Sequence, residues 1–199
     1  MVFYFLQFAA ILLLTLGATF LLGRVMKSKG FKVKQTANCL IMTLVTISLF
    51  LLGLNDPVWV LRGIVFALIL LYASVQDLTF READDFLWVM ILILAIGSIG
   101  TVPVWSMLLG AAVVFVPQMA IACGAYSLKK GGIGGADIKL STAAALLLGF
   151  FPGAIGYVVG LAFAILFTLI YNKIKHRTNQ KSFPLIPFLS VGLMIGYLL

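Results

Sequence analysis

The organisation of this chain follows from one stretch, Gly131-Gly132-Ile133-Gly134-Gly135-Ala136-Asp137-Ile138-Lys139. Long apolar segments precede and follow it. Of the six carboxylates in the chain, only Asp137 lies between residue 86 and the C-terminus. An ionisable group at the edge of an apolar span is costly, which favours a functional role. The alternative is a solvated acid at the start of a helix, where the helix dipole stabilises it.

The composition is that of a membrane protein. The 199 residues are 63% hydrophobic and 10% charged, and the mean hydropathy is +1.17. Soluble domains do not have this composition. We therefore expect an all-α, polytopic membrane protein with roughly eight spans of about 20 residues. The net charge of +8 lies in short loops between apolar runs, so we expect contact with the lipid bilayer and no nucleic-acid partner.

The predicted spans are separated by polar or proline-containing turns. They lie at about 3–23, 36–54, 59–76, 86–101, 104–127, 137–150, 154–172 and 183–199. Pro117 is expected to kink the fifth span, and Pro187 to interrupt the eighth. Asp77 directly follows the third span and opens a polar loop that runs to Asp85.

The basic residues predict the orientation. Alternating spans place 13 of the 14 lysines and arginines on one side, with Arg62 alone on the other. The positive-inside rule makes that side cytoplasmic, so both termini are expected outside the cell membrane. Asp77 and Asp137 then share one membrane depth on the cytoplasmic side. They can meet if the third and sixth spans pack together, which the small residues 143–145 would permit.

Two carboxylates at one site suggest acid–base chemistry. Such a pair does not easily hold two charges, so one member keeps a proton. The charged member can take a proton from water while the other polarises a peptide carbonyl or protonates a leaving amine. His176, the only histidine, lies in a basic loop, so nothing supports a histidine-based triad or a metal site. Cys39 and Cys123 form no CxxC motif, and we expect two buried thiols. No cofactor or metal is expected.

Other charged residues allow two readings each. Asp84 and Asp85 suit the N-cap and first turn of the fourth span, or substrate recognition. Arg81 suits pairing with a loop acid or with a lipid phosphate. Lys139 either holds the charge of Asp137 or marks the cytoplasmic interface.

The two aspartate motifs together resemble the type IV prepilin peptidases and the archaeal preflagellin peptidases, which are GxGD membrane aspartyl proteases. Gly134-Gly135-Ala136-Asp137 matches the G-x-G-D motif except at Ala136, and Lys139 follows as is often seen. Asp77 and Arg81 match the first motif, whereas residues 83–85 replace its usual Ile-Pro-Asn. The stretch from Phe183 to Leu189 is similar to the family's proline-containing last helix.

The resemblance covers about residues 60–199. It implies a six-helix peptidase core at 59–199, preceded by a two-helix membrane segment at 1–58 with a short basic loop. Asp77 and Asp137 become the catalytic dyad. The implied supporting residues are Gly134, Gly135, Ala136, Lys139 and Arg81.

The implied substrate is a membrane-inserted, pilin-like precursor, cut at the cytoplasmic face just before its hydrophobic helix. We expect Glu82, Asp84 and Asp85 to bind its basic leader. Larger relatives carry a zinc-binding CxxC domain linked to N-methylation, but residues 24–35 are all that stands in its place here. We therefore expect a peptidase without methyltransferase activity.

Two other readings remain. One is a small proton-coupled transporter or channel that uses its membrane-edge aspartates. The other is an intramembrane protease resembling presenilin, whose first aspartate follows a tyrosine within a span.

Overall fold

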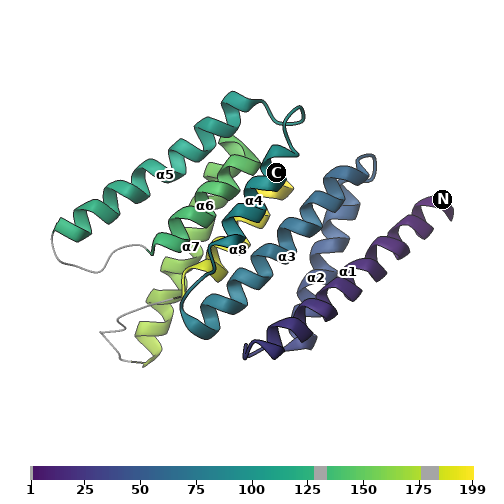
Figure 1. The fold of residues 1–199 in the computed structure, drawn as a ribbon, viewed down its shortest axis with the longest axis horizontal. Coiled ribbons are helices and arrows are strands. Elements are labelled where there is room, and N and C mark those ends of the chain that lie inside the picture. Colours follow the sequence, from purple (N-terminus) through teal and green to yellow (C-terminus); the bar gives the residue numbers. More distant parts are fainter. Residues whose placement is uncertain (1, 128–133, 176–183) are drawn as a thin grey trace.

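The computed structural model describes residues 2–127, 134–175 and 184–199, and within these it contains helices and no strand. Figure 1 shows the eight helices. They are α1 (Val2–Ser28), α2 (Gln35–Leu52), α3 (Pro57–Phe80), α4 (Phe86–Ile96), α5 (Val104–Ser127), α6 (Gly135–Leu148), α7 (Phe150–Lys175) and α8 (Ile186–Leu198). The predicted all-α class is confirmed.

The helices are of two lengths. By length and composition, α1, α2, α3, α5 and α7 can each cross a membrane. In contrast, α4, α6 and α8 have 11, 14 and 13 residues. At 1.5 Å per residue these reach about 16–21 Å, less than a hydrocarbon core of about 30 Å. The protein is therefore a polytopic membrane protein with five long helices and three short ones.

All eight predicted spans correspond to helices, but several of their ends differ by four or five residues: α1 continues to Ser28 and α3 to Phe80. The helix α4 ends at Ile96 instead of residue 101, because Gly97 and Gly100 follow, and Gly100 adopts a φ of +102° that favours glycine. Pro187 does not interrupt a helix. It lies in the first turn of α8, where its missing N–H has no helical partner to lose.

The centre of the bundle is α3. It packs against α1 and α2 on one side and against α4 and α8 on the other (Figure 1). Both α4 and α8 also contact α6, which is covered by α5 and α7. Over their full, described lengths, α3 and α6 nowhere come within 8 Å of each other at Cα. The two aspartates therefore do not depend on direct packing of the third and sixth spans, because α4 and α8 bridge α3 and α6.

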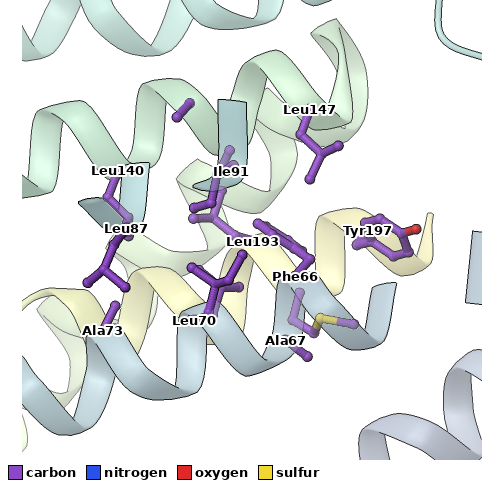
Figure 2. Packing of buried hydrophobic residues seen from close by; sticks show 14 of the residues in the cluster. Phe66, Ala67, Leu70, Ala73, Leu87, Ile91, Leu140, Leu147, Leu193 and Tyr197 are labelled. Atoms are coloured by element: carbon purple, nitrogen blue, oxygen red, sulfur yellow. The ribbon is translucent and has the colours of Figure 1, made fainter. Parts of the chain in front are cut away.

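The core lies where α3, α4, α6 and α8 meet, and Figure 2 shows its side chains interdigitating. They include Phe66 and Leu70 of α3, Leu87 and Ile91 of α4, Leu140 and Leu147 of α6, and Leu193 of α8. Because lipid is as apolar as these side chains, close packing is what holds the four helices together. This packing sets how the helix ends are placed relative to one another.

Glycines bring α7 and α8 into backbone contact. Gly156 and Gly160 face Gly192 and Gly196, each pair separated by three residues. A Cβ added at Gly156 would lie 2.8 Å from the Gly192 carbonyl oxygen. This is the close approach that small residues at four-residue spacing permit in membranes. It fixes the position of α8, whose N-terminus lies in the site described next.

Candidate active site

Asp77 lies inside the last turn of α3, which continues to Phe80. The predicted loop from residue 77 is therefore wrong as far as Phe80. Arg81 ends the helix in the left-handed conformation, with φ 62°, and its N–H donates to the Asp77 carbonyl at 3.0 Å. As a result Asp77 points into the bundle, and only 7% of it is exposed.

The Asp77 carboxylate accepts a hydrogen bond from the backbone N–H of Ile186 at 3.1 Å. Ile186 is the first residue of α8. The free N–H groups and the dipole at a helix N-terminus favour a carboxylate there. Sequence reasoning missed Ile186, because a backbone donor leaves no signature in its side chain.

Asp137 lies in the first turn of α6, after the N-cap residue Gly134. A Cβ added at Gly134 would lie 2.9 Å from the Asp137 Oδ2 atom. Glycine here leaves the carboxylate its present place, because any Cβ would make it shift; the φ of −64° itself suits any residue. Gly135 differs, because a Cβ there would meet nothing within 4 Å. Residues 131–133 of the same stretch lie outside the described part of the chain.

Ala136 stands where the G-x-G-D motif has its second glycine. In the structure it is a helical residue, the second of α6. Helical backbone is compatible with alanine and more stable with it than with glycine. The substitution is thus accommodated by the local conformation.

Asp77 and Asp137 lie within electrostatic range of each other. Sixty residues separate them in the sequence, and α4 and α8 lie between their helices. The two acids are brought together at one end of the bundle, where α3 ends and α6 and α8 begin. Two interacting carboxyls titrate as one unit and can share a proton.

A buried polar group supports the first turn of α6. The Ser141 hydroxyl donates to the Asp137 carbonyl at 2.6 Å, and the Gln118 amide donates to Ser141 at 2.8 Å. Gln118 is 1% exposed and follows Pro117 inside α5. A buried amide that is hydrogen-bonded at both ends holds the two helices in register. Gln118 and Ser141 were not identified from the sequence, because a single polar residue in an apolar span gives no indication of its hydrogen-bond partner.

Tyr157 is a second residue that the sequence did not reveal. It belongs to α7, is buried, and lies within electrostatic range of Asp137. An isolated tyrosine in an apolar span carries no motif. Its place beside Asp137 emerges only when α6 and α7 are packed together.

Three exposed acids, Glu82, Asp84 and Asp85, lie between α3 and α4. Asp85 occupies the N-cap position of α4, but its side chain makes no capping bond. It accepts a hydrogen bond from the Lys139 ammonium at 2.7 Å, and this bond lowers the pKa of Asp85. Asp85 is therefore at the start of the helix, as one of the two readings held, but its side chain pairs with Lys139 and does not cap the helix. Lys139 pairs with this loop acid and ties α6 to α4.

Two further contacts shape this end of the bundle. The Asp84 N–H donates to the Gln76 side-chain oxygen at 3.2 Å, which holds the α3–α4 connection against α3. The charge of Arg81 acts on Asp77. Arg81 therefore lies close enough to influence the site, which the sequence suggested only through its four-residue spacing from Asp77.

The structure tests the expected burial of the two cysteines but not the expectation for the histidine. Cys39 is half-buried and Cys123 is exposed on α5, and neither is in a disulfide. The predicted burial of Cys123 is wrong, because an apolar span in a small bundle exposes one face to lipid. His176 lies outside the described residues.

Comparison with known proteins gives one match. Searches of curated proteins and of solved structures returned no match. The model of the type IV leader peptidase family matches residues 64–173, more than half of the 199 residues. The matched region contains both Asp77 and Asp137. With its all-helical membrane fold, the chain belongs to the type IV leader peptidase family.

Proposed function

We propose that the protein is a membrane aspartyl endopeptidase that removes the leader of pilin-like or preflagellin-like precursors, with Asp77 and Asp137 as its catalytic dyad. Membership of the family makes it a leader peptidase-like protease. The observation that supports the aspartic assignment is that the end of α3 and the start of α6 bring both carboxyls to one end of the bundle, within electrostatic range of each other. Burial makes their shared charge costly and so favours a proton held between them.

The proposed reaction uses one charged and one protonated carboxyl. The charged carboxylate removes a proton from a water molecule, whose oxygen attacks the peptide carbonyl carbon. The protonated carboxyl gives its proton to the carbonyl oxygen, forming a tetrahedral diol. When the C–N bond breaks, a proton passes to the leaving amine, and the products are a carboxylic acid and an amine. No covalent bond to the protein forms.

The exposed acids suit the basic leader of such a precursor. Among the described residues, Asp85 is engaged by Lys139, whereas Glu82 and Asp84 form no ion pair. These two therefore remain available to a lysine or arginine of the leader. Attraction by exposed charges acts mostly on the association rate and falls with added salt.

The α1–α2 connection bears on two parts of the proposal: the side of the membrane on which the dyad lies, and whether the protein also methylates its product. The α1–α2 connection carries several lysines, and it lies at the same end as Asp77 and Asp137. The positive-inside rule then places the dyad at the cytoplasmic face. Because residues 29–34 alone join α1 to α2, we propose leader cleavage without N-methylation of the product.

The test is cleavage of a pilin-like precursor by the purified protein, run beside Asp77→Asn and Asp137→Asn. Each replacement is expected to abolish cleavage while the thermal midpoint Tm stays close to that of the parent. Asp56→Asn is the matched control. Asp56 caps α3 at the opposite end by accepting the Trp59 N–H at 2.9 Å, and asparagine caps equally well. Full cleavage by either dyad variant would remove that residue from the mechanism.

A further inference from the structure

An apolar groove of about 410 Å³ lies between α2 and α8, with α3 as its floor. Ile41 of α2, Leu78 of α3 and Val191 of α8 line it, and each is at least half exposed. The groove therefore opens sideways at the surface that faces the bilayer. It is a place where something embedded in the membrane can bind.

One end of the groove lies near Asp77. Leu78 and Pro187 line one of its ends. They are the sequence neighbours of Asp77 and Ile186, which are joined by the 3.1 Å hydrogen bond. An occupant lying along the groove would thus have one end beside the Asp77 carboxylate.

One polar side chain in the groove has no partner. Asn38 lines the groove and is only 7% exposed. Its side-chain amide makes no hydrogen bond to any residue that the structure describes. Among the described residues, the side-chain polar atoms that are fully enclosed without a partner do not include those of Asn38, so its amide is accessible from the groove that it lines. Facing lipid, an unpaired amide is unfavourable, and its place in the groove points to an occupant that supplies a hydrogen-bonding group. Asn38 lies in the first turn of α2, at the same end as Asp77.

The polar side chains on the floor of the groove, by contrast, are hydrogen-bonded. The Ser74 hydroxyl donates to the Leu70 carbonyl at 2.7 Å, and its oxygen shares a hydrogen bond of 2.9 Å with the Ser190 hydroxyl of α8. These bonds hold α3 against α8. The groove is therefore preformed, and the Asn38 amide is the lining group left for an occupant to pair.

The dimensions favour one face of a helix. The α8 lining runs from Pro187 to Leu198, which is about 16 Å at 1.5 Å per residue. A helix of that length and about 10 Å diameter has a volume of roughly 1,300 Å³. The groove holds about 410 Å³, so it accommodates the side chains along one helix face and leaves the rest in lipid. This is the helix-in-groove mode of recognition.

We infer that the groove seats the apolar helix of the precursor, with the end that follows the cut bond beside Asp77 and with one polar side chain of that helix hydrogen-bonded to Asn38. The inference rests on the proposed function. A lipid acyl chain fits the apolar walls equally well, but it offers the Asn38 amide no partner. A substrate helix supplies both the apolar face and the hydrogen bond.

The first test fills the groove. Ile41→Trp places a bulky side chain on its rim, while Leu40→Trp makes the same change on the lipid-facing side of α2, outside the groove. Ile41→Trp is expected to raise KM for the full-length precursor at least tenfold, and Leu40→Trp to change it less than twofold. Equal effects of the two would overturn the inference. Cleavage by the parent protein tests the proposed function separately, so the two failures are distinguishable.

The second test removes the amide. Asn38→Leu keeps the side-chain size and deletes the unpaired polar group, so Tm is expected to rise while KM for the precursor rises at least fivefold. An amide with a merely structural role would give the opposite sign in Tm and no change in KM. Unchanged KM would overturn the assigned hydrogen bond.

The third test needs no turnover and only a small substitution. In a protein carrying Asp137→Asn, with Cys39 and Cys123 replaced by alanine, we would place a cysteine at Ile41 or at Leu40. A precursor with a single cysteine in its apolar helix is expected to form a disulfide with Ile41→Cys and not with Leu40→Cys. Cross-linking at both positions, or at neither, would overturn the inference.

Discussion

Lys139 reaches from the first turn of α6 to Asp85 at the start of α4, and its ammonium lies 2.7 Å from the carboxylate. Asp137 lies two residues before Lys139 in the sequence. The ion pair therefore links the segment that carries one aspartate of the proposed dyad to the α3–α4 connection that follows the other. Both side chains are largely exposed, at 49% and 73%, so the link is more important for placement than for stability.

The link gives a prediction about non-additivity. Lys139→Gln and Asp85→Asn are each expected to lower kcat/KM by about fivefold or less, and the double variant to be no worse than either. This is because each change breaks the same contact. A double-mutant cycle with the precursor measures it. If Asp85 instead binds the leader directly, Asp85→Asn will be harmful on its own and the two effects will multiply.

The same pair sets a pH expectation. Lys139 lowers the pKa of Asp85 below its ordinary value of 3.8. A lowered pKa means that the pairing is complete above the ordinary value and is lost only as the pH falls through the lowered one. Loss of activity between pH 5 and 7 is therefore not expected to depend on Asp85. Parallel pH profiles of the parent and Asp85→Asn over that range check this.

Gly134 is expected to be essential for space. Gly134→Ala puts a Cβ at 2.9 Å from the Asp137 Oδ2 atom and forces the carboxylate to move. A displacement of about 1 Å at a catalytic group costs up to about 10²-fold in rate, so kcat should fall by that order with little change in Tm. Gly135→Ala, whose Cβ enters open space, should lose far less. Equal losses at both positions would show that flexibility, and not space, is what the motif requires.

Arg81 allows its backbone and side-chain roles to be separated. Its left-handed conformation costs roughly 1–2 kcal/mol for a residue with a Cβ. Arg81→Gly should therefore be about 1 kcal/mol more stable than Arg81→Ala. Both variants remove the charge that acts on Asp77, so they should lose the same activity. Thermal unfolding and precursor cleavage measure the two effects. If the more stable glycine variant also recovers activity, the backbone turn and not the charge is what matters.

The α7–α8 contact is expected to control the site from a distance. A Cβ added at Gly192 would collide with the backbone of Gly156 and Gly160. Gly192→Ala should cost about 1–3 kcal/mol by overpacking and should lower kcat by shifting the Ile186 N–H away from Asp77. Gly124→Ala on α5, where a Cβ meets nothing within 4 Å, is the control. Loss of stability without loss of activity would separate α8 from catalysis.

How much of this the sequence revealed depends on the kind of interaction. Hydropathy and proline placement gave eight helices, because crossing a bilayer requires helical apolar segments. The two aspartates were found because charge is rare in such segments. Hydropathy does not predict which helices are neighbours, because every apolar helix face can contact either lipid or another helix. Whether the third and sixth spans are in contact was therefore left open by the sequence, and α4 and α8 were not foreseen as the bridge between them.

The residues of the site that the sequence analysis did not identify were missed for one physical reason. Ile186 acts through its backbone N–H, Gln118 and Ser141 act through each other, and Tyr157 matters only beside Asp137. None of these depends on a local pattern. The left-handed Arg81 was equally hidden, so the sequence placed Asp77 in a loop when it lies in a helix.

The hydrogen bond from Ile186 to Asp77 has a consequence for recognising working members of this family in genomes. The matched region ends at residue 173, before α8 begins. A gene shortened after that point would still encode both aspartates and would still pass as a leader peptidase. Its Asp77 carboxylate would lack the backbone donor that holds it, and the groove would lose one wall. A search for functional copies should therefore ask for the last helix as well as for the two aspartates.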